Sequence, residues 1–161
     1  MSRVPSKSKA EDLFIRACKH EDEGDLKSAF RLMSAAAKLG DIGAQLNVGN
    51  YYDSGQGVHR NRAAAMYWYK RAYRRGYSCA AHNVGIMWRN ENQPRRALGW
   101  FKRAVDLGDD ESHLEIGKHY LRNENNPAKA IVHFKRVIRA EVVTEAGLEE
   151  AAELLREAEK R

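Results

Sequence analysis

One helical pattern occurs three times along this chain, at residues 61–76, 94–108 and 127–140. The first copy reads NRAAAMYWYKRAYRRG and places alanine and aromatic side chains at i, i+4 and i+7 spacing, which gathers them on one face of a helix. Lysine and arginine side chains fall largely on the opposite face. Because a single helix hairpin cannot bury such an apolar face alone, the recurrence predicts hairpins that stack against one another.

Glycine, alanine and aromatic residues define the register of this repeat. The turn glycines Gly40, Gly76 and Gly108 lie 36 and then 32 residues apart. Equivalent positions in the second helix of each repeat carry Ala65, Ala97 and Ala130, and then Tyr69, Phe101 and Phe134. No segment has the sustained period-two alternation of a strand. We therefore predict an all-α fold, a right-handed α-solenoid of about four helix-turn-helix repeats plus a C-terminal capping helix.

The boundaries of these elements follow from capping residues and prolines. We expect residues 1–7 to form a mobile N-terminal arm and residues 8–161 to form a single repeat domain. The repeats are predicted at 8–40, 41–76, 77–108 and 109–141, and the capping helix at 144–159. Helix starts are indicated by N-cap side chains at Ser8, Asp41, Asn61 and Thr144, and by Pro94 and Pro127 at first helical positions. A further helix is expected from Asp110 to about Arg122.

The first helix of three repeats contains a glycine at an equivalent position, namely Gly49, Gly85 and Gly117. A glycine inside a helix lowers helix stability by about 1 kcal/mol relative to alanine, so three exposed glycines would destabilise the fold with no compensating contact. The pattern therefore predicts that the second helix of each hairpin crosses over the glycine, where a Cβ would clash.

Composition limits the classes of protein that this chain can belong to. With 161 residues, of which 43% are hydrophobic and 31% charged, the chain is predicted to be folded and soluble. No apolar run approaches the ~20 residues that span a membrane, and no apolar segment follows the basic N-terminus. We therefore expect a cytoplasmic location and no membrane span. Cys18 and Cys79 lie at non-equivalent positions, and we expect both to be reduced.

No motif for catalysis or metal binding is present in the sequence. The six histidines show neither an HExxH motif nor a close metal-ligand spacing, and no serine or cysteine lies in a GxSxG-like context. The GxG sequence at Gly55 and Gly57 lacks the GK[ST] that completes a phosphate-binding loop. We therefore predict a protein that is not an enzyme and that uses no metal and no cofactor.

Residues 44–76 carry the most specific motif. They read A-x3-V-G-x2-Y-x2-G-x-G-V-x2-N-x3-A-x2-W-Y-x-R-A-x3-G, which resembles the Sel-one-like repeat family, a branch of the tetratricopeptide superfamily. The GxGV loop at residues 55–58 distinguishes that family, whereas the other units have shorter, tetratricopeptide-like turns. The resemblance implies protein or peptide binding by a scaffold, adaptor or chaperone-like module, and no chemistry. The cysteine pair within each repeat of secreted family members is absent here.

In such a solenoid the first helices of the repeats line the concave face. The side opposite the three helix glycines is therefore predicted to bind a protein or peptide, with side-chain amides able to hold a peptide backbone. Its residues are Leu46, Asn47, Asn50, Asp53, His82, Asn83, Ile86, Arg89, Leu114, Glu115 and Lys118. The alternative is that the leucines and Ile86 pack on neighbouring helices and that the other residues are ordinary solvated surface.

A second predicted surface is a basic stripe on the second helices of the repeats. It consists of Lys70, Arg71, Arg74, Arg75, Lys102, Arg103, Lys135 and Arg136. From His59 to Arg103 there are eleven Arg or Lys residues and a single acid, within a chain whose net charge is +6. The stripe suggests an electrostatic adaptor for nucleic acid or an acidic partner, although lysine and arginine are also simply good helix formers. No nucleic-acid-binding motif appears, and the aromatic residues fall at core positions.

Two further expectations concern the biological role and the oligomeric state. By analogy alone, the chain is a candidate chaperone or immunity protein for a secreted effector. We expect a monomer or a weak homo-oligomer, since a short array of repeats can associate through its terminal helices.

Overall fold

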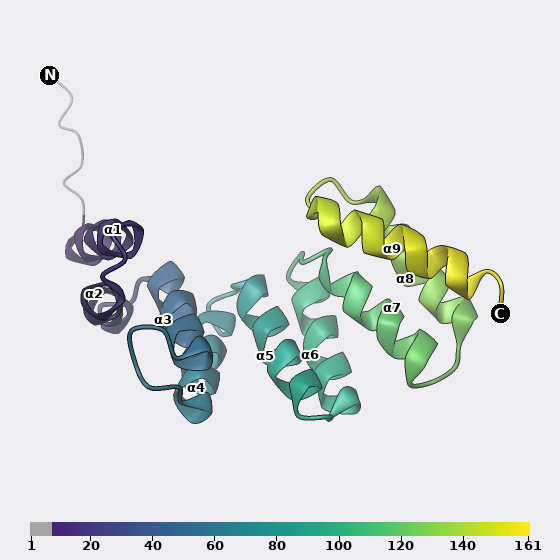
Figure 1. Cartoon of the computed structure of the whole chain (residues 1–161), viewed down its shortest axis with the longest axis horizontal. Coiled ribbons are helices and arrows are strands. Elements are labelled where there is room, and N and C mark those ends of the chain that lie inside the picture. Colours follow the sequence, from purple (N-terminus) through teal and green to yellow (C-terminus); the bar gives the residue numbers. More distant parts are fainter. Residues whose placement is uncertain (1–7) are drawn as a thin grey trace, which may run out of the picture. The chain divides into compact units, whose positions relative to one another are not determined.

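The computed structural model describes residues 8–161, which form nine α-helices and no strand (Figure 1). The helices are α1 (Lys9–Asp22), α2 (Leu26–Lys38), α3 (Ile42–Ser54), α4 (Arg62–Tyr73), α5 (Ser78–Asn90), α6 (Pro94–Asp106), α7 (Ser112–Arg122), α8 (Pro127–Arg139) and α9 (Glu145–Ala158). Consecutive helices pair as hairpins, so the predicted all-α solenoid architecture is confirmed. The expected arm at residues 1–7 lies outside the described residues.

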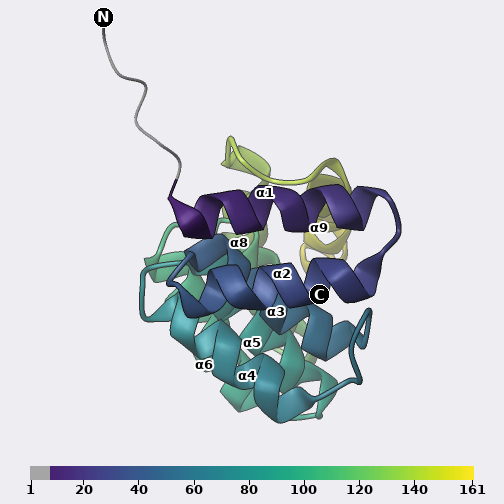
Figure 2. The ribbon, with the colours of Figure 1, turned by 90° about the vertical axis from the view of Figure 1, so that its left-hand side faces the viewer.

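The chain divides into two compact units, residues 1–77 and 78–161, here called unit 1 and unit 2. That residues 8–161 act as one repeat domain stays a prediction. In unit 1, α1 and α2 run side by side as the first hairpin, and α3 and α4 form the second (Figure 2). The N-caps expected at Ser8, Asp41 and Asn61 are present, because each side chain accepts a hydrogen bond from the backbone N–H three residues on.

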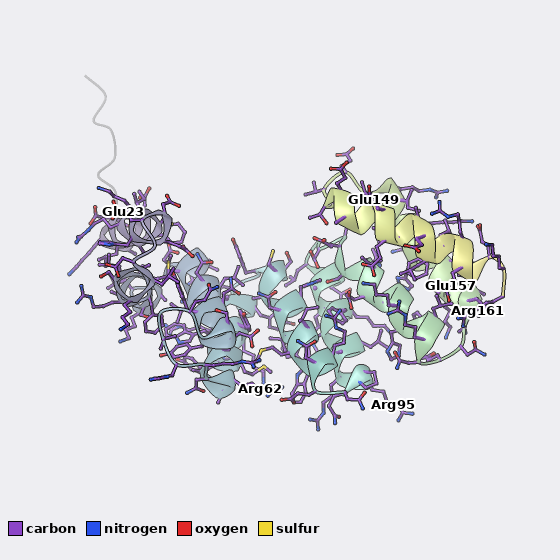
Figure 3. The ribbon with its side chains drawn as sticks, viewed as in Figure 1. Glu23, Arg62, Arg95, Glu149, Glu157 and Arg161 are labelled. Atoms are coloured by element: carbon purple, nitrogen blue, oxygen red, sulfur yellow. The ribbon has the colours of Figure 1, made fainter. Side chains whose placement is uncertain are left out.

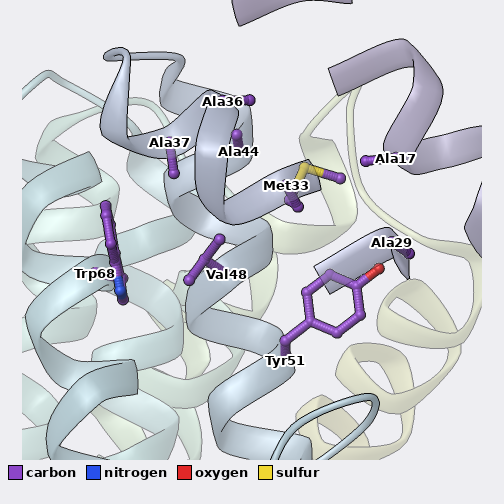
Figure 4. Packing of buried hydrophobic residues seen from close by; sticks show 9 residues of the cluster. All are labelled: Ala17, Ala29, Met33, Ala36, Ala37, Ala44, Val48, Tyr51 and Trp68. Atoms are coloured by element: carbon purple, nitrogen blue, oxygen red, sulfur yellow. The ribbon is translucent and has the colours of Figure 1, made fainter. Parts of the chain in front are cut away.

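Small residues on α2 and α3 form the centre of the unit 1 core. Ala36, Ala37 and Ala44 are fully buried, so the two helices approach closely (Figure 4). Val48 of α3 and Trp68 of α4 pack against this group, and Trp68 is only 9% exposed. The apolar face that the repeated sequence pattern predicts is therefore the face through which the two hairpins of this unit pack against each other.

Unit 2 contains two hairpins, α5–α6 and α7–α8, followed by α9 packed on α8. Pro94 and Pro127 occupy the first turns of α6 and α8, and Thr144 caps α9, as expected. Phe101 and Phe134 are buried in separate apolar clusters of the unit. Glu149 and Glu157 lie on the exposed side of α9 (Figure 3), which gives this last helix the polar outer surface of a cap.

One predicted helix start is wrong. The helix expected from Asp110 begins at Ser112, because the backbone N–H groups of Ser112, His113 and Leu114 donate to carbonyl groups three residues back, so that a tighter turn precedes the α-helix. The contact from the Asp109 carboxylate to the Ser112 backbone N–H, which matches the capping contact of Asp41 in α3, is nevertheless present.

The GxGV loop is explained by a close approach of backbones in unit 1. A Cβ on Gly57 would meet the backbone carbonyl of Leu26 at the start of α2, and the φ of Gly57 is 67°. Both conditions favour glycine. The loop thereby brings Val58 against the unit 1 core.

The predicted crossing of the second helix of a hairpin over the glycine in its first helix is confirmed in both units. A Cβ on Gly49 would collide with the ring of Tyr69, and one on Gly117 would collide with the ring of Phe134. At Gly85 the Cβ would lie 2.6 Å from Cε1 of Phe101. Each hairpin of the repeated pattern therefore joins through a glycine on its first helix and an aromatic ring on its second.

We predict that Gly85→Val lowers the free energy of unfolding by about 1–3 kcal/mol, because the new side chain must displace the buried Phe101 ring. Chemical denaturation followed by circular dichroism measures this change. Gly99→Ala in α6 is the matched control: its Cβ would meet only the flexible Arg103 side chain at 3.5 Å, so we expect it to stabilise by about 0.5–1 kcal/mol. An unchanged midpoint for Gly85→Val would contradict the crossing.

Candidate functional site

In unit 1, the predicted partner-binding residues lie along α3 and differ in how firmly they are held. Asn50 is exposed, and its side-chain oxygen accepts a hydrogen bond of 2.8 Å from the Tyr69 hydroxyl. Asn47 is partly buried, with its amide nitrogen 4.0 Å from the sulfur of Met33. Leu46 and Asp53 are also partly buried. This face is therefore partly fixed by the same tyrosine ring that covers Gly49.

In unit 2, three of the predicted residues form an ion cluster that joins α5, α7 and α9. Arg89 Nη1 lies 2.5 Å from Oε2 of Glu115, and Lys118 Nζ lies 3.0 Å from Oε1 of the same carboxylate. Lys118 also reaches Glu150 of α9 at 2.8 Å. Glu115 is only 8% exposed, so the cluster satisfies a carboxylate that would otherwise be buried without a partner.

The pKa of Glu115 reflects this competition. Burial raises the pKa of the carboxyl group, but the hydrogen bonds and positive charges of Lys118 and Arg89 outweigh burial and hold the pKa below its usual value. Glu115 therefore stays ionised at neutral pH. With Glu150 included, the cluster contains two anions and two cations, and its exposed cation is Arg89.

A pocket of about 290 Å³ opens beside this ion cluster. Its charged wall includes Arg89, Glu115 and Lys118, and its apolar wall comes from α6. The residues beyond those expected from the sequence are Pro94, Ala97, Leu98, Phe101, His119, Arg122 and Asn123. Counting helical steps on the first helices alone does not reveal these contributions of α6 and of the end of α7.

The other predicted residues of unit 2 mostly serve packing. Leu114 is 5% exposed and lies in the apolar cluster with Phe134, so it is not available to a partner. Ile86 packs against the cluster around Phe101 and Ile116. For these two residues the packing interpretation is the one that the structure favours. Asn83 is partly buried on α5.

His82 belongs to a hydrogen-bonded group that has the residue types of a catalytic triad. Its Nδ1 lies 2.8 Å from Oγ of Ser112 and 3.2 Å from Oδ2 of Asp109, and the Ser112 hydroxyl bonds to the same Asp109 oxygen. A catalytic triad uses the two ring nitrogens separately, one for the acid and one for the serine. Here both contacts converge on Nδ1 and Ser112 is fully buried, so the group fixes α5 to the start of α7.

The pKa of Asp109 agrees with this interpretation. Burial raises the pKa of its carboxyl group, but hydrogen bonds from His82 and Ser112 bring it below its usual value.

In residues 8–161, no three His, Cys, Asp or Glu side chains are grouped so as to hold a metal ion. Neither Cys18 nor Cys79 takes part in a disulfide. No helix in this part of the chain is long and apolar enough to cross a membrane.

The basic stripe is described separately in each unit. In unit 1, Arg71 lies over the Trp68 ring and donates to the Tyr67 hydroxyl at 3.2 Å, and Arg75 donates to the Gly40 carbonyl at 3.4 Å. Arg74 is exposed and Lys70 partly buried. The arginines that flank the core here are therefore partly engaged within the unit.

In unit 2 the stripe comprises Lys102 and Arg103 on α6 and Lys135 and Arg136 on α8, and all four are exposed. Arg103 donates to the Gly99 carbonyl, and Lys135 lies 3.7 Å from Glu159. These contacts are local and leave most of the positive surface open to solvent.

The three tryptophans each have an arginine over the ring, a contact that residue spacing in the sequence did not predict. The guanidinium carbons of Arg71, Arg96 and Arg103 lie 5.5, 4.7 and 4.9 Å from the ring centroids of Trp68, Trp88 and Trp100. Trp88 and Trp100 are only partly buried. An arginine over an indole ring gains cation–π attraction, so these rings bind the arginines to the surface.

A histidine pair that sequence spacing did not reveal joins α7 to α8. Nδ1 of His113 lies 2.9 Å from Nδ1 of His133, so one ring donates and the other accepts, and the Tyr120 ring stacks on His133. Burial lowers the pKa of His133 to about 4, with further lowering by the charges of His113, Arg136 and Lys102. Burial also lowers the pKa of His113.

Comparison with known proteins identifies the repeat. A model of the Sel1 repeat family matches residues 23–41, 42–77 and 80–109, which is more than half of the chain. A putative sel1-like repeat-containing protein of Acanthamoeba polyphaga mimivirus is 25% identical over 97 residues, and the match covers 60% of this chain and 18% of that protein. The chain thus spans less than a fifth of the length of that relative.

Solved structures share the fold. A Sel1 repeat protein from Oxalobacter formigenes has a TM-score of 0.71 and 20% identity, covering 98% of this chain and 74% of that one. A protective antigen of uropathogenic Escherichia coli with an SLR fold has a TM-score of 0.73 and 16% identity, covering 95% and 38%. YrrB, a TPR protein with an unusual peptide-binding site, has a TM-score of 0.62 and 21% identity, covering 95% and 79%.

We predict that unit 2 loses stability in mild acid because of the histidine pair. The folded-state pKa of His133 lies below the unfolded value of ~6.5, so the unfolded chain binds more protons between those pH values. This contribution is present above pH ~6.5 and is lost as the pH falls towards the folded-state pKa of about 4. We expect about 1–2 kcal/mol less free energy of unfolding at pH ~5 than at pH ~7 from this source.

Urea denaturation at a series of pH values measures this loss. His133→Gln should remove most of it, whereas His59→Gln, which changes an exposed histidine outside the pair, should keep it. Identical pH dependence in the wild-type chain and His133→Gln would rule out the assignment.

Proposed function

Since the chain belongs to the Sel1 repeat family, we propose that it is a non-catalytic protein-binding module that holds a peptide segment at the pocket of unit 2. Sel1-like and tetratricopeptide-like repeats are generally protein-interaction scaffolds. The observation that carries the proposal is the meeting of a charged wall with an apolar wall in one pocket of about 290 Å³. Ligand pockets combine these features, since apolar surface supplies affinity and a few polar groups fix orientation.

The roles of the pocket residues follow from their contacts. Leu98 and Pro94, which are both only partly buried, offer apolar surface for a partner side chain. Arg122 is exposed at the rim and can pair with an acidic or carbonyl group of the partner. Glu115 is already paired with Arg89 and Lys118, so it holds the two cations in place and its own charge is neutralised locally.

On α3, the exposed Asn50 and the partly buried Asn47 and Asp53 belong to the same proposal as a second contact region, within unit 1. The amide of Asn50 is oriented by the Tyr69 hydroxyl, which favours a defined over a mobile contact. A cytoplasmic location and a monomeric or weakly associating state stay predictions.

The pocket is tested with peptides selected on the purified chain from a random-sequence display library, with the dissociation constant measured by calorimetry. We expect Arg122→Ala and Leu98→Ala each to weaken binding by about 1 kcal/mol, which is roughly a fivefold rise in Kd. Arg95→Ala is the matched control, because Arg95 is an equally exposed arginine on α6 that does not line the pocket.

Two results would contradict this proposal. One is a set of selected peptides whose affinity is unchanged by both pocket substitutions. The other is an affinity that falls steeply with added salt and is lost on charge reversal at Lys102 and Arg103, which would indicate the electrostatic adaptor of the basic stripe instead. Binding to a single effector protein through neither surface would favour the chaperone or immunity role.

A further inference from the structure

Unit 1 contains a groove of about 440 Å³ that belongs neither to the predicted partner-binding face nor to the basic stripe. Its walls come from α2, α3 and α4: Phe30 of α2, Tyr52 of α3 and Trp68 of α4 supply aromatic surface, and the polar residues Arg31, Ser34 and Lys38 lie along α2. The groove therefore combines aromatic surface, a hydroxyl group and two cations, and this combination indicates the chemical class of ligand that would fit it.

The aromatic side of the groove is rigid and offers limited ring surface. Phe30 and Tyr52 meet edge to face, with centroids 5.2 Å apart and an angle of 83° between the rings. Trp68 is anchored in the core beside Val48 (Figure 4) and is only 9% exposed. Such a wall suits one inserted apolar side chain better than a series of stacked bases, which need open ring faces.

The hydroxyl oxygen of Ser34 is buried in this groove and has no hydrogen-bond partner among the described residues. A buried polar group without a partner destabilises the folded protein, and natural structures keep few of them. A ligand backbone or side chain that enters the groove would supply the missing hydrogen bond once the covered Ser34 hydroxyl rotates towards the groove.

Two cations flank Ser34 along α2. Arg31 and Lys38 are exposed, lie seven residues apart on the helix and form no ion pair with any residue of the described chain. Seven residues correspond to about 10 Å along a helix, so the long side chains can reach two carboxylates on one ligand. In unit 2, by contrast, the cations Arg89 and Lys118 are already paired with Glu115.

We propose that this groove binds an extended peptide in which an apolar residue, preferably aromatic, is flanked on both sides by acidic residues. In an extended chain, neighbouring side chains point to opposite faces. The central side chain therefore packs against Tyr52 and Trp68, while the two carboxylates pair with Arg31 and Lys38. A peptide backbone amide or carbonyl bonds to Ser34. The site stands independently of the pocket in unit 2.

The test is a titration of the ¹⁵N-labelled full chain with three short synthetic peptides, GEFEG, GQFQG and GEGEG, followed by NMR. GEFEG should shift the Trp68 indole signal and the amide signals of residues 30–38. The neutral GQFQG and the GEGEG peptide, which lacks the aromatic ring, should each bind at least fivefold more weakly.

Variants distinguish binding of the peptide in the groove from nonspecific attraction of an acidic peptide to a basic protein. The double substitution of Arg31→Ala with Lys38→Ala should raise the Kd for GEFEG about 5- to 30-fold, as expected for loss of two exposed ion pairs. Arg16→Ala with Lys27→Ala removes the same charge from exposed positions on α1 and α2 outside the groove, and should change the Kd less than twofold. Ser34→Ala should weaken peptide binding yet raise the midpoint of thermal unfolding.

Three results would overturn the proposal: no shift of the Trp68 signal by GEFEG, equal binding of GEFEG and GQFQG, or equal effects of the two double substitutions. A single-stranded oligouridylate that shifts the same signals at lower concentration than GEFEG would assign the groove to nucleic acid instead.

Discussion

The contact between a glycine on the first helix of a hairpin and an aromatic ring on the second is the constraint on which the other features depend. At Gly85 there is no room for a Cβ, because the Phe101 ring occupies that space, and Gly49 meets Tyr69 in the same way. Omitting the side chain costs helix stability but lets the two backbones approach and fixes the rotation of each helix. The ring then positions polar groups beyond it. The Tyr69 hydroxyl orients Asn50, and the Phe101 ring lies edge to face with His82.

The positive charge available at the surface depends on which basic side chains are paired within the protein as well as on how many there are. In unit 2 the buried Glu115 collects two cations, and Lys118 extends the cluster to α9. Removing one member would leave a buried charge without its partner, which is far more costly than loss of an exposed pair. Several arginines are held over tryptophan rings, among them Arg71 and Arg103. The number of basic residues in the sequence therefore overstates the positive surface that is free to attract a partner.

Helical periodicity and end signals were sufficient to predict the hairpins, since both are local properties. Apolar spacing identified the buried face, and Asp41, Asn61 and Thr144 cap their helices as predicted. The pocket and the ion cluster could not be predicted in this way. Arg89 and Glu115 are 26 residues apart, and their contact depends on how one hairpin tilts against the next. The position of a residue around its own helix, which is what apolar spacing predicts, contains no information about this tilt. Leu114 was also expected on the binding face, but it lies three residues before Gly117 and therefore on the same side of the helix, where packing with the apolar cluster buries it.

The surface residues of the repeat can vary because the contact between the two helices of a hairpin depends on few positions. The residue one turn beyond each helix glycine is aromatic throughout, but its surroundings differ. Tyr52 meets Phe30 and lines a groove, Trp88 carries the guanidinium of Arg96, and Tyr120 stacks on His133. Because the glycine and the opposing ring already determine the crossing, the neighbours of this aromatic residue can change without disturbing the hairpin. The same backbone geometry can therefore present an unpaired basic groove in one unit and a paired ion cluster in the other, which is how repeats of one family come to bind different partners.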